Sequence, residues 1–255
     1  GEDIYINLYA RSEARLATSL HEVDIMQHTD YPRTGTISLT IHPARKQTFA
    51  LRCRVPGWAQ GRPVPTDLYR YADSRGSFSI RVNGKDTGYR MENGYAVIRR
   101  KWKKGDKVEL CFPMEVRCVL ARDEVEDNRG KAALERGPVV YCLEDKDQPD
   151  GTVFNKFIPV GTPVSASFEP DLLRGVVTLH GQARALDWDG RVTDIPFKAI
   201  PYSVWNNRGT AQMAVWIPVT AEQARPEPEP TLASQSRTLT FQAPIQKDAP
   251  ESAAT

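Results

Sequence analysis

Apolar and polar residues alternate along several short segments of the chain. Residues 36–41 alternate in strict period two, and residues 49–55 continue the pattern until a Pro-Gly pair ends it. Such alternation places one face of a strand on a core and the other face in solvent. The Asn83-Gly84 dipeptide adds a strong hairpin signal. The strands expected in this part of the chain are 4–9, 36–41, 49–55, 78–82, 95–99 and 108–112. Their number and spacing are typical of one β-sandwich.

A polar, charged stretch at residues 124–129 interrupts this rhythm, and a new apolar run follows at 139–143. Further strands are expected at 153–158, 174–186, 196–204 and 211–218. The pattern fails after residue 219, and proline then alternates with glutamate over residues 226–230, which favours an extended linker.

The sequence therefore predicts an all-β protein with two consecutive antiparallel β-sandwich domains of jelly-roll-like form. The first domain is expected to cover residues 1–120 and the second residues 121–222. Residues 223–255 are expected to form a Pro/Glu-rich linker and an extended, disordered tail.

Composition limits the classes of partner. The 255 residues are 40% hydrophobic, enough for one large or two ordinary domains with proper cores. Thirty-four Lys and Arg against 32 Asp and Glu give a net charge of +2, so no bulk positive field predicts a nucleic acid or an anionic membrane as partner. No apolar run reaches the roughly 20 residues of a membrane span, and the first ten residues lack the features of a signal peptide. The compartment stays open.

The cysteines and histidines do not predict a metal site. Cys53, Cys111, Cys118 and Cys142 form no CxxC or CxH pattern, so buried free thiols are the simplest interpretation, with a disulfide left open. The four histidines include His21 and His28, whose odd separation puts them on opposite faces of a strand.

No catalytic residue is predicted from the residues alone. The local carboxylate clusters are Asp187 with Asp189, and Glu124 with Glu126 and Asp127. Each cluster precedes a glycine, and acidic residues are common in turns, so solvated turns explain both clusters. Motifs for acyl transfer, dinucleotide binding and phosphate binding are absent from the sequence.

Two tryptophans are candidates for contact with carbohydrate, since a flat apolar ring can stack on a sugar. Trp58 follows Pro56-Gly57, and Trp205 precedes Asn206, so both lie at loop edges. Trp102 and Trp216 end strand-like runs and are expected to pack in the core or between domains.

Several strings occur in a characteristic order. They are YINLY at 5–9, DYP at 30–32, RVPGWA at 54–59, VNG at 82–84 and GYAVIRR at 94–100, followed by VEDNRGKAALERGPVVYCLE at 125–144 and IPYSVWNNRG at 200–209. Over about residues 4–218 the chain resembles glycoside hydrolase family 127, the β-L-arabinofuranosidase family.

The resemblance implies two β-sandwich domains that follow an N-terminal (α/α)6 barrel, and the barrel holds the active site. The resemblance implies an active site with a cysteine nucleophile held on zinc and a glutamate as acid/base. It also implies a Cys-Cys pair shortly before the strand that opens this chain. None of the four cysteines here lies in such a pair, so no catalytic or zinc residue is carried over. Zinc is expected in the missing catalytic domain, and this chain is expected to be a piece of a longer enzyme.

The leading hypothesis is a non-catalytic part of a family 127-like glycosidase, inactive alone, that supports the barrel. The expected partners are the upstream barrel, a second copy in a homodimer and, through the parent enzyme, an arabinofuranose-containing glycan. The tripeptide Asn-Arg-Gly occurs at 128–130 and 207–209, and an arginine fork can hold carbonyls or carboxylates. The residues expected to bridge the domains are Asp127, Asn128, Arg129, Asn207 and Arg208, with the bridges of Arg129 and Arg208 lying either between the domains or within one. The alternative is a stand-alone carbohydrate-binding or interaction module that uses Trp58 or Trp205.

Overall fold

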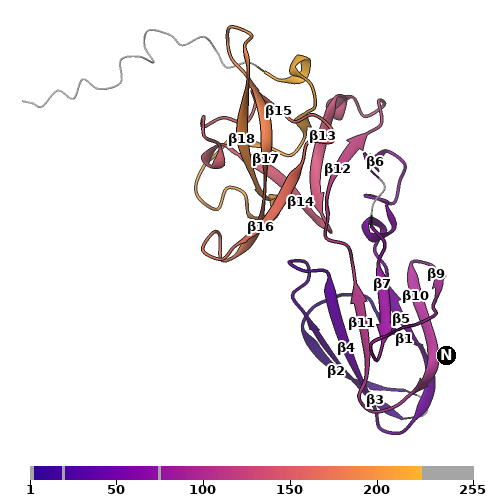
Figure 1. The fold of residues 1–255 in the computed structure, drawn as a ribbon. Coiled ribbons are helices and arrows are strands. Elements are labelled where there is room, and N and C mark those ends of the chain that lie inside the picture. The colour runs from indigo at the N-terminus through magenta and orange to yellow at the C-terminus, as the bar shows by residue number, and fades with distance from the viewer. Residues whose placement is uncertain (1–2, 19–20, 74–75, 226–255) are drawn as a thin grey trace, which may run out of the picture.

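The computed structural model describes residues 3–18, 21–73 and 76–225, and these residues form two β-rich domains (Figure 1). The predicted all-β class is confirmed. The few helices are short 3-10 turns: η1 (Gly57–Gln60), η2 (Glu126–Asn128), η3 (Asp145–Asp147), η4 (Tyr202–Val204) and η5 (Ala221–Gln223). In the part of the chain that the structure describes, no helix is long and apolar enough to cross a membrane.

The first domain consists of two sheets. The four-stranded sheet has the order β1 (Asp3–Ile6), β5 (Gln47–Arg54), β10 (Tyr95–Trp102) and β9 (Arg90–Glu92). The six-stranded sheet has the order β2 (Ser12–Ala17), β3 (Glu22–Thr29), β4 (Thr36–Pro43), β11 (Asp106–Cys111), β7 (Ser79–Val82) and β8 (Lys85–Asp86). All pairings are antiparallel except β1 with β5, which is parallel.

Alternation along these strands builds the core of the first domain. On β4, Ile37, Leu39 and Ile41 are fully buried, and the polar residues between them are not. The ring of Trp102 at the end of β10 is also fully buried, and its Nε1 donates a hydrogen bond to the Phe49 carbonyl at 3.1 Å. The expectation that Trp102 packs in the core is confirmed.

The second domain is built on one continuous ten-stranded sheet. The main path has the order β15 (Lys156–Phe157), β17 (Val176–Leu186), β18 (Val192–Pro201), β14 (Val139–Glu144), β13 (Lys131–Arg136), β12 (Val116–Ala121) and β6 (Tyr69–Tyr71). Three further strands pair beside it: β16 (Val164–Glu169) with β17, β19 (Met213–Ala214) with β14, and β20 (Ile217–Pro218) with β13. Its core takes apolar side chains from β13, β14, β17 and β18.

Strand β6 ties the two domains together. It belongs to the first half of the sequence, but it pairs with β12, placing Tyr71 opposite Val119 and Tyr69 opposite Ala121. The ring of Trp216, near β20, stacks on Tyr69 at 5.5 Å between centroids, as expected for a tryptophan that packs between parts of the chain. The segment between β5 and β7 therefore leaves the first domain and completes the edge of the second sheet.

The change of domain lies between β11 and β12, because β12 already pairs with β13. The expected boundary at residues 120 and 121 falls inside β12. Most of the expected tail, residues 226–255, lies outside the described residues. Before that point the chain stays attached to the second domain, since η5 covers Ala221–Gln223 and the Arg225 amide donates to the Phe154 carbonyl at 3.0 Å.

Candidate functional site

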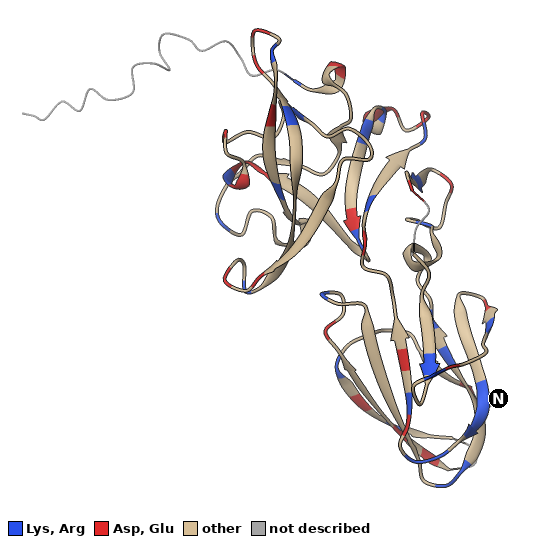
Figure 2. Cartoon of the chain, in the orientation of Figure 1, with Lys and Arg blue, Asp and Glu red and all other residues tan. Residues whose placement is uncertain are grey.

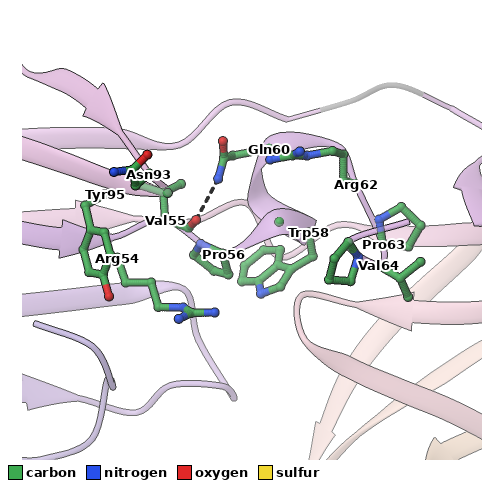
Figure 3. Close-up of a pocket in the computed structure, with 13 residues that line it drawn as sticks. Arg54, Val55, Pro56, Trp58, Gln60, Arg62, Pro63, Val64, Asn93 and Tyr95 are labelled. Atoms are coloured by element: carbon green, nitrogen blue, oxygen red, sulfur yellow. Dashed lines mark hydrogen bonds between the residues drawn. The ribbon is translucent and has the colours of Figure 1, made fainter. Parts of the chain in front are cut away.

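A pocket of about 420 Å³ opens where β5 and β10 meet the segment that leads to β6 (Figure 3). Figure 3 shows Arg54 and Tyr95 on one side of Pro56 and the segment Arg62–Val64 on the other, with the Trp58 ring between them. The lining residues are Arg54, Val55, Pro56, Gly57, Trp58, Gln60, Arg62, Pro63, Val64, Pro65, Asn93, Gly94 and Tyr95.

Local hydrogen bonds fix the backbone of this pocket. The Val55 amide donates to the Gly94 carbonyl at 2.8 Å, and Gln60 Nε2 donates to the Val55 carbonyl at 2.7 Å. The hairpin turn between β9 and β10 uses Asn93 and Gly94 with φ of 49° and 83°, the left-handed region that a tight turn requires. Gly61, with φ of 79°, ends η1 in the same way.

Trp58 is buried, with 8% of its surface exposed. Its ring stacks on Tyr31 and meets Phe112 edge-on, with centroid distances of 6.5 Å and 5.6 Å. Its carbonyl accepts a hydrogen bond from Arg117 Nη1 at 2.8 Å. The fold of η1 thus turns this ring into the core, so Trp58 does not present the open face that stacking on a sugar requires.

The pocket carries positive charge without compensation from its own lining, which contains no Asp or Glu. Arg54 and Arg62 are exposed, and neither guanidinium has an ion pair among the described residues. Glu92, on the adjacent strand β9, already pairs with Arg52 and Arg90. Basic and acidic residues occur on both domains in Figure 2, so the excess of positive charge at the pocket is local.

Tyrosine hydroxyls surround the base of Arg54. Tyr95 lies directly opposite Arg54 in the strand register, and its hydroxyl donates to Asn7 Oδ1 at 2.8 Å. The hydroxyl of Tyr9 donates to the Arg54 carbonyl, and burial raises the pKa of Tyr9 well above its usual value. The Tyr9 hydroxyl is therefore a neutral hydrogen-bonding group.

The second candidate tryptophan lies in the other domain. Trp205 ends η4 and is partly exposed, and nothing brings it to the pocket of Trp58. The turn after it is held by Glu144, which is fully buried and accepts the Asn206 amide at 3.1 Å. The side chain of Asn207 donates to the Val204 carbonyl at 3.0 Å and closes the same turn.

Arg208 makes its bridge within the second domain. Its Nη1 donates to Asp147 Oδ1 at 2.9 Å, and its Nη2 contacts the carboxylates of both Asp147 and Glu144. These hydrogen bonds, Asp147 first, raise the pKa of Arg208 above its usual value. Glu144 ends β14 and Asp147 ends η3 directly after it, so the bridge of Arg208 lies within the second domain.

The first Asn-Arg-Gly segment is also bonded mainly to its own surroundings. Arg129 donates from Nη2 and Nε to the Asp123 carbonyl, at 2.7 Å and 3.1 Å. The Asp127 carbonyl accepts Lys131 Nζ at 2.8 Å. Asn128 alone reaches the first half of the sequence, through a 3.4 Å contact of Nδ2 with the Tyr69 hydroxyl on β6.

The acidic clusters behave as turn residues. Asp189 Oδ1 accepts the Arg191 amide at 3.1 Å, in an exposed turn beside Trp188. Hydrogen bonds from its own amide and from Arg122 lower the pKa of the exposed Glu124. A raised carboxyl pKa occurs at Glu135, where burial is the largest cause and the hydroxyl of Tyr71, at 2.8 Å, opposes it.

The described residues do not fit the zinc centre that the family resemblance implies. Among them, no group of three or more His, Cys, Asp or Glu side chains is arranged to hold a metal ion. Burial raises the pKa of both Cys53 and Cys142 to about 12, so both thiols are protonated at neutral pH and are poor nucleophiles. All four cysteines are free.

Two family models match consecutive parts of the chain. One describes the GH127 middle domain of β-L-arabinofuranosidases and matches residues 3–114, and the other describes the glycoside hydrolase family 127 C-terminal domain and matches residues 116–218. The chain belongs to glycoside hydrolase family 127. The family resemblance of the sequence is thereby confirmed, and the two matched regions meet where β11 gives way to β12.

Relatives of this family 127 chain are longer. A non-reducing end β-L-arabinofuranosidase of Bifidobacterium longum subsp. longum is 27% identical over 237 residues, which cover 85% of this chain and 33% of that protein. A solved GH127 β-arabinofuranosidase is 35% identical with a TM-score of 0.84, and 89% of this chain covers 36% of it. A GH127 β-L-arabinofuranosidase from Geobacillus stearothermophilus T6 is 37% identical with a TM-score of 0.75, with coverage of 85% and 34%. The chain spans about a third of the length of these relatives.

Sequence reasoning missed two features of this family 127 chain. The unpaired arginines of the pocket follow ordinary strand and loop patterns, and their lack of partners is visible only in three dimensions. The second is Arg117, which is buried with 7% exposed and has its guanidinium 4.7 Å from the Tyr71 ring. The one signal available was an arginine between apolar residues on β12, which alone does not reveal the partner on β6.

Proposed function

We propose that this chain is the non-catalytic β-sandwich part of a β-L-arabinofuranosidase-type enzyme, and that it supports a preceding (α/α)6 barrel that carries out hydrolysis. The observation that carries the proposal is the coverage of the matches. They include most of this chain but only about a third of each relative. The substrate of the whole enzyme would be an arabinofuranose-containing glycan, and zinc would be held by the barrel.

The chemistry of the described residues is consistent with a non-catalytic role. Glycoside hydrolysis uses two carboxyl groups about 5–10 Å apart on either side of the bond. The pocket has no carboxylate in its lining, and Glu135 is engaged by Tyr71 rather than facing that pocket. The thiols of Cys53 and Cys142 are buried, so they cannot reach a substrate.

The edge of the β1–β5–β10–β9 sheet at β1 is the surface that we assign to the barrel. Tyr5 on β1 is 51% exposed, and Leu8, just after β1, is 81% exposed, so both present apolar surface at the edge strand of this sheet. The ring of Tyr5 meets Tyr95 edge-on at 5.3 Å, and Arg52 lies 5.5 Å from its centroid. Because β1 is the first strand, a preceding domain would enter the structure beside this edge.

Hydrolysis of a chromogenic β-L-arabinofuranoside tests the proposal. We expect no activity from the 255-residue chain and activity from a polypeptide in which a family 127 barrel precedes it, with zinc and reductant present. Replacing Tyr5 and Leu8 by aspartate should lower the melting temperature of the joined enzyme, because a charge would be buried against the barrel. The matched control is Trp188→Asp, an exposed aromatic in the second domain. Activity from the chain alone would overturn the non-catalytic role.

A homodimer contact is part of the same proposal. Size-exclusion chromatography with light scattering on the joined enzyme measures its mass directly. A mass of one polypeptide would remove the dimer from the proposal and leave the supporting role unchanged.

A further inference from the structure

The pocket beside Pro56 combines two exposed arginines with a largely apolar lining. Two exposed arginines, Arg54 and Arg62, come from separate segments, and neither is paired with a carboxylate among the described residues. By contrast, Arg52 on the same sheet forms ion pairs with Asp3 and Glu92, at 2.7 Å each. Free guanidinium groups at a concave site form strong bidentate hydrogen bonds with a carboxylate.

The walls between the arginines are apolar and flat. Pro56, Pro63 and Pro65 line the pocket with Val64 and the ring of Tyr95. Such surfaces pack against the C–H faces of a sugar ring, and the volume of about 420 Å³ lies within the range of about 300–1,000 Å³ typical of small-ligand sites. The pocket therefore combines ring-sized apolar walls with cationic groups.

Hydrogen bonds and prolines hold the walls of the pocket in place. Its Tyr95 hydroxyl is held by Asn7, its Gln60 side chain is held by the Val55 carbonyl, and its prolines restrict the backbone. The walls therefore need little ordering on binding, and the ordering cost falls mainly on the side chains of Arg54 and Arg62.

We propose that this pocket is an accessory subsite for a carboxylate-bearing sugar, a uronate unit in a glycan. The inference rests on the proposed function only for the choice of a glycan, and it assigns no part in hydrolysis to the pocket. Arg54 and Arg62 lie on different sides of the Trp58 ring, so each binds a carboxylate of the glycan, and the proline and Tyr95 surfaces hold the sugar rings between them. An acidic side chain from a preceding barrel is the competing occupant of the same arginines.

The test is titration of the 255-residue chain with trigalacturonate by isothermal calorimetry and by two-dimensional NMR. The matched neutral probe is the same trisaccharide with its carboxyls methyl-esterified. We expect trigalacturonate to bind saturably and its methyl ester to bind at least tenfold more weakly. Added salt should lower the affinity for trigalacturonate. The amide signals that shift should include those of Gln60, Gly94 and Tyr95.

Three variants separate the subsite from general charge attraction. Arg54→Gln and Arg62→Gln should each weaken binding of the acid by about tenfold, since each removes a charge-assisted hydrogen bond. Arg45→Gln is the matched control, because it removes the same charge at the opposite end of β5. Equal weakening in all three variants, equal binding of acid and ester, or no binding would each overturn the subsite.

A last comparison distinguishes the competing occupant. If trigalacturonate binds the 255-residue chain but not the same chain joined to a barrel, the arginines serve as a contact with the barrel, and the subsite is wrong. If the joined enzyme binds it equally well, the subsite stands. The arabinofuranoside assay tests the proposed function separately from the subsite, since we assign neither Arg54 nor Arg62 a part in hydrolysis.

Discussion

Replacing Arg117 by methionine should destabilise both domains together. Arg117 is on β12 of the second sheet, yet its Nη1 donates to the Trp58 carbonyl at 2.8 Å and its guanidinium stacks on Tyr71 of β6. A hydrogen bond from a charged donor contributes about 1.5–3 kcal/mol, and a cation–π contact about 0.5–2 kcal/mol. Methionine keeps much of the side-chain volume, so we expect the free energy of unfolding to fall by about 3 kcal/mol.

The loss should depend on pH because of Glu135, which lies opposite Arg117 in the strand register. Burial raises the pKa of Glu135, and the Arg117 charge opposes that rise. A carboxyl whose pKa is raised on folding contributes stability that is full below its unfolded pKa and is lost as pH rises through its folded pKa. Without Arg117 the folded pKa of Glu135 rises further, so the variant should lose more stability at pH 8 than at pH 5.

Urea unfolding at both pH values measures this loss, followed by tryptophan fluorescence and by circular dichroism. Arg184→Met is the matched control, since Arg184 is an exposed strand arginine with a 3.4 Å pair to Asp194, and its loss should cost less than about 0.5 kcal/mol. In the Arg117→Met background, Glu135→Gln should restore part of the stability at pH 8. An Arg117→Met variant that matches the control, or whose loss is the same at both pH values, would refute the reasoning.

Two further predictions concern buried groups. With a thiol reagent at pH 8, the exposed Cys111 should react first and Cys53 and Cys142 only on unfolding, because burial raises the pKa of both to about 12; a fast phase that survives Cys111→Ser would contradict this. Asp150→Ala should cost about 3 kcal/mol in urea unfolding, because it removes the 2.5 Å partner of the fully buried Lys156 ammonium. Adding Lys156→Met should restore part of that loss, and a double variant no more stable than Asp150→Ala would show that the buried charge is not its cause.

Strands with one clean apolar face were predictable from the sequence. Residues 36–41 and 95–99 fall inside β4 and β10, because their burial follows the period-two pattern. Strand β2 escaped prediction because nearly all its side chains are exposed, so it has no apolar face to detect. The strand-like stretch between His21 and His28 lies in β3, where the side chain of Gln27 is buried and its Nε2 donates to the carbonyls of Leu8 and Ala10.

The candidate site was predictable only in part. The string around Pro56-Gly57-Trp58 drew attention to the right segment, since a Pro-Gly pair ends a strand wherever it occurs. Whether Trp58 faced solvent or the core depended on the path of η1, which packs the ring against Tyr31 and Phe112 from distant segments.

The sequence by itself determined the all-β class, the family and the order of the two domains, because these depend on local alternation and on strings of neighbouring residues. Only the tertiary structure decided that β6 completes the second sheet, that Arg208 binds within one domain and that Arg54 and Arg62 have no acidic partner. Each of these depends on pairings between residues far apart in the chain, and a local pattern carries no information about which distant partner a side chain meets.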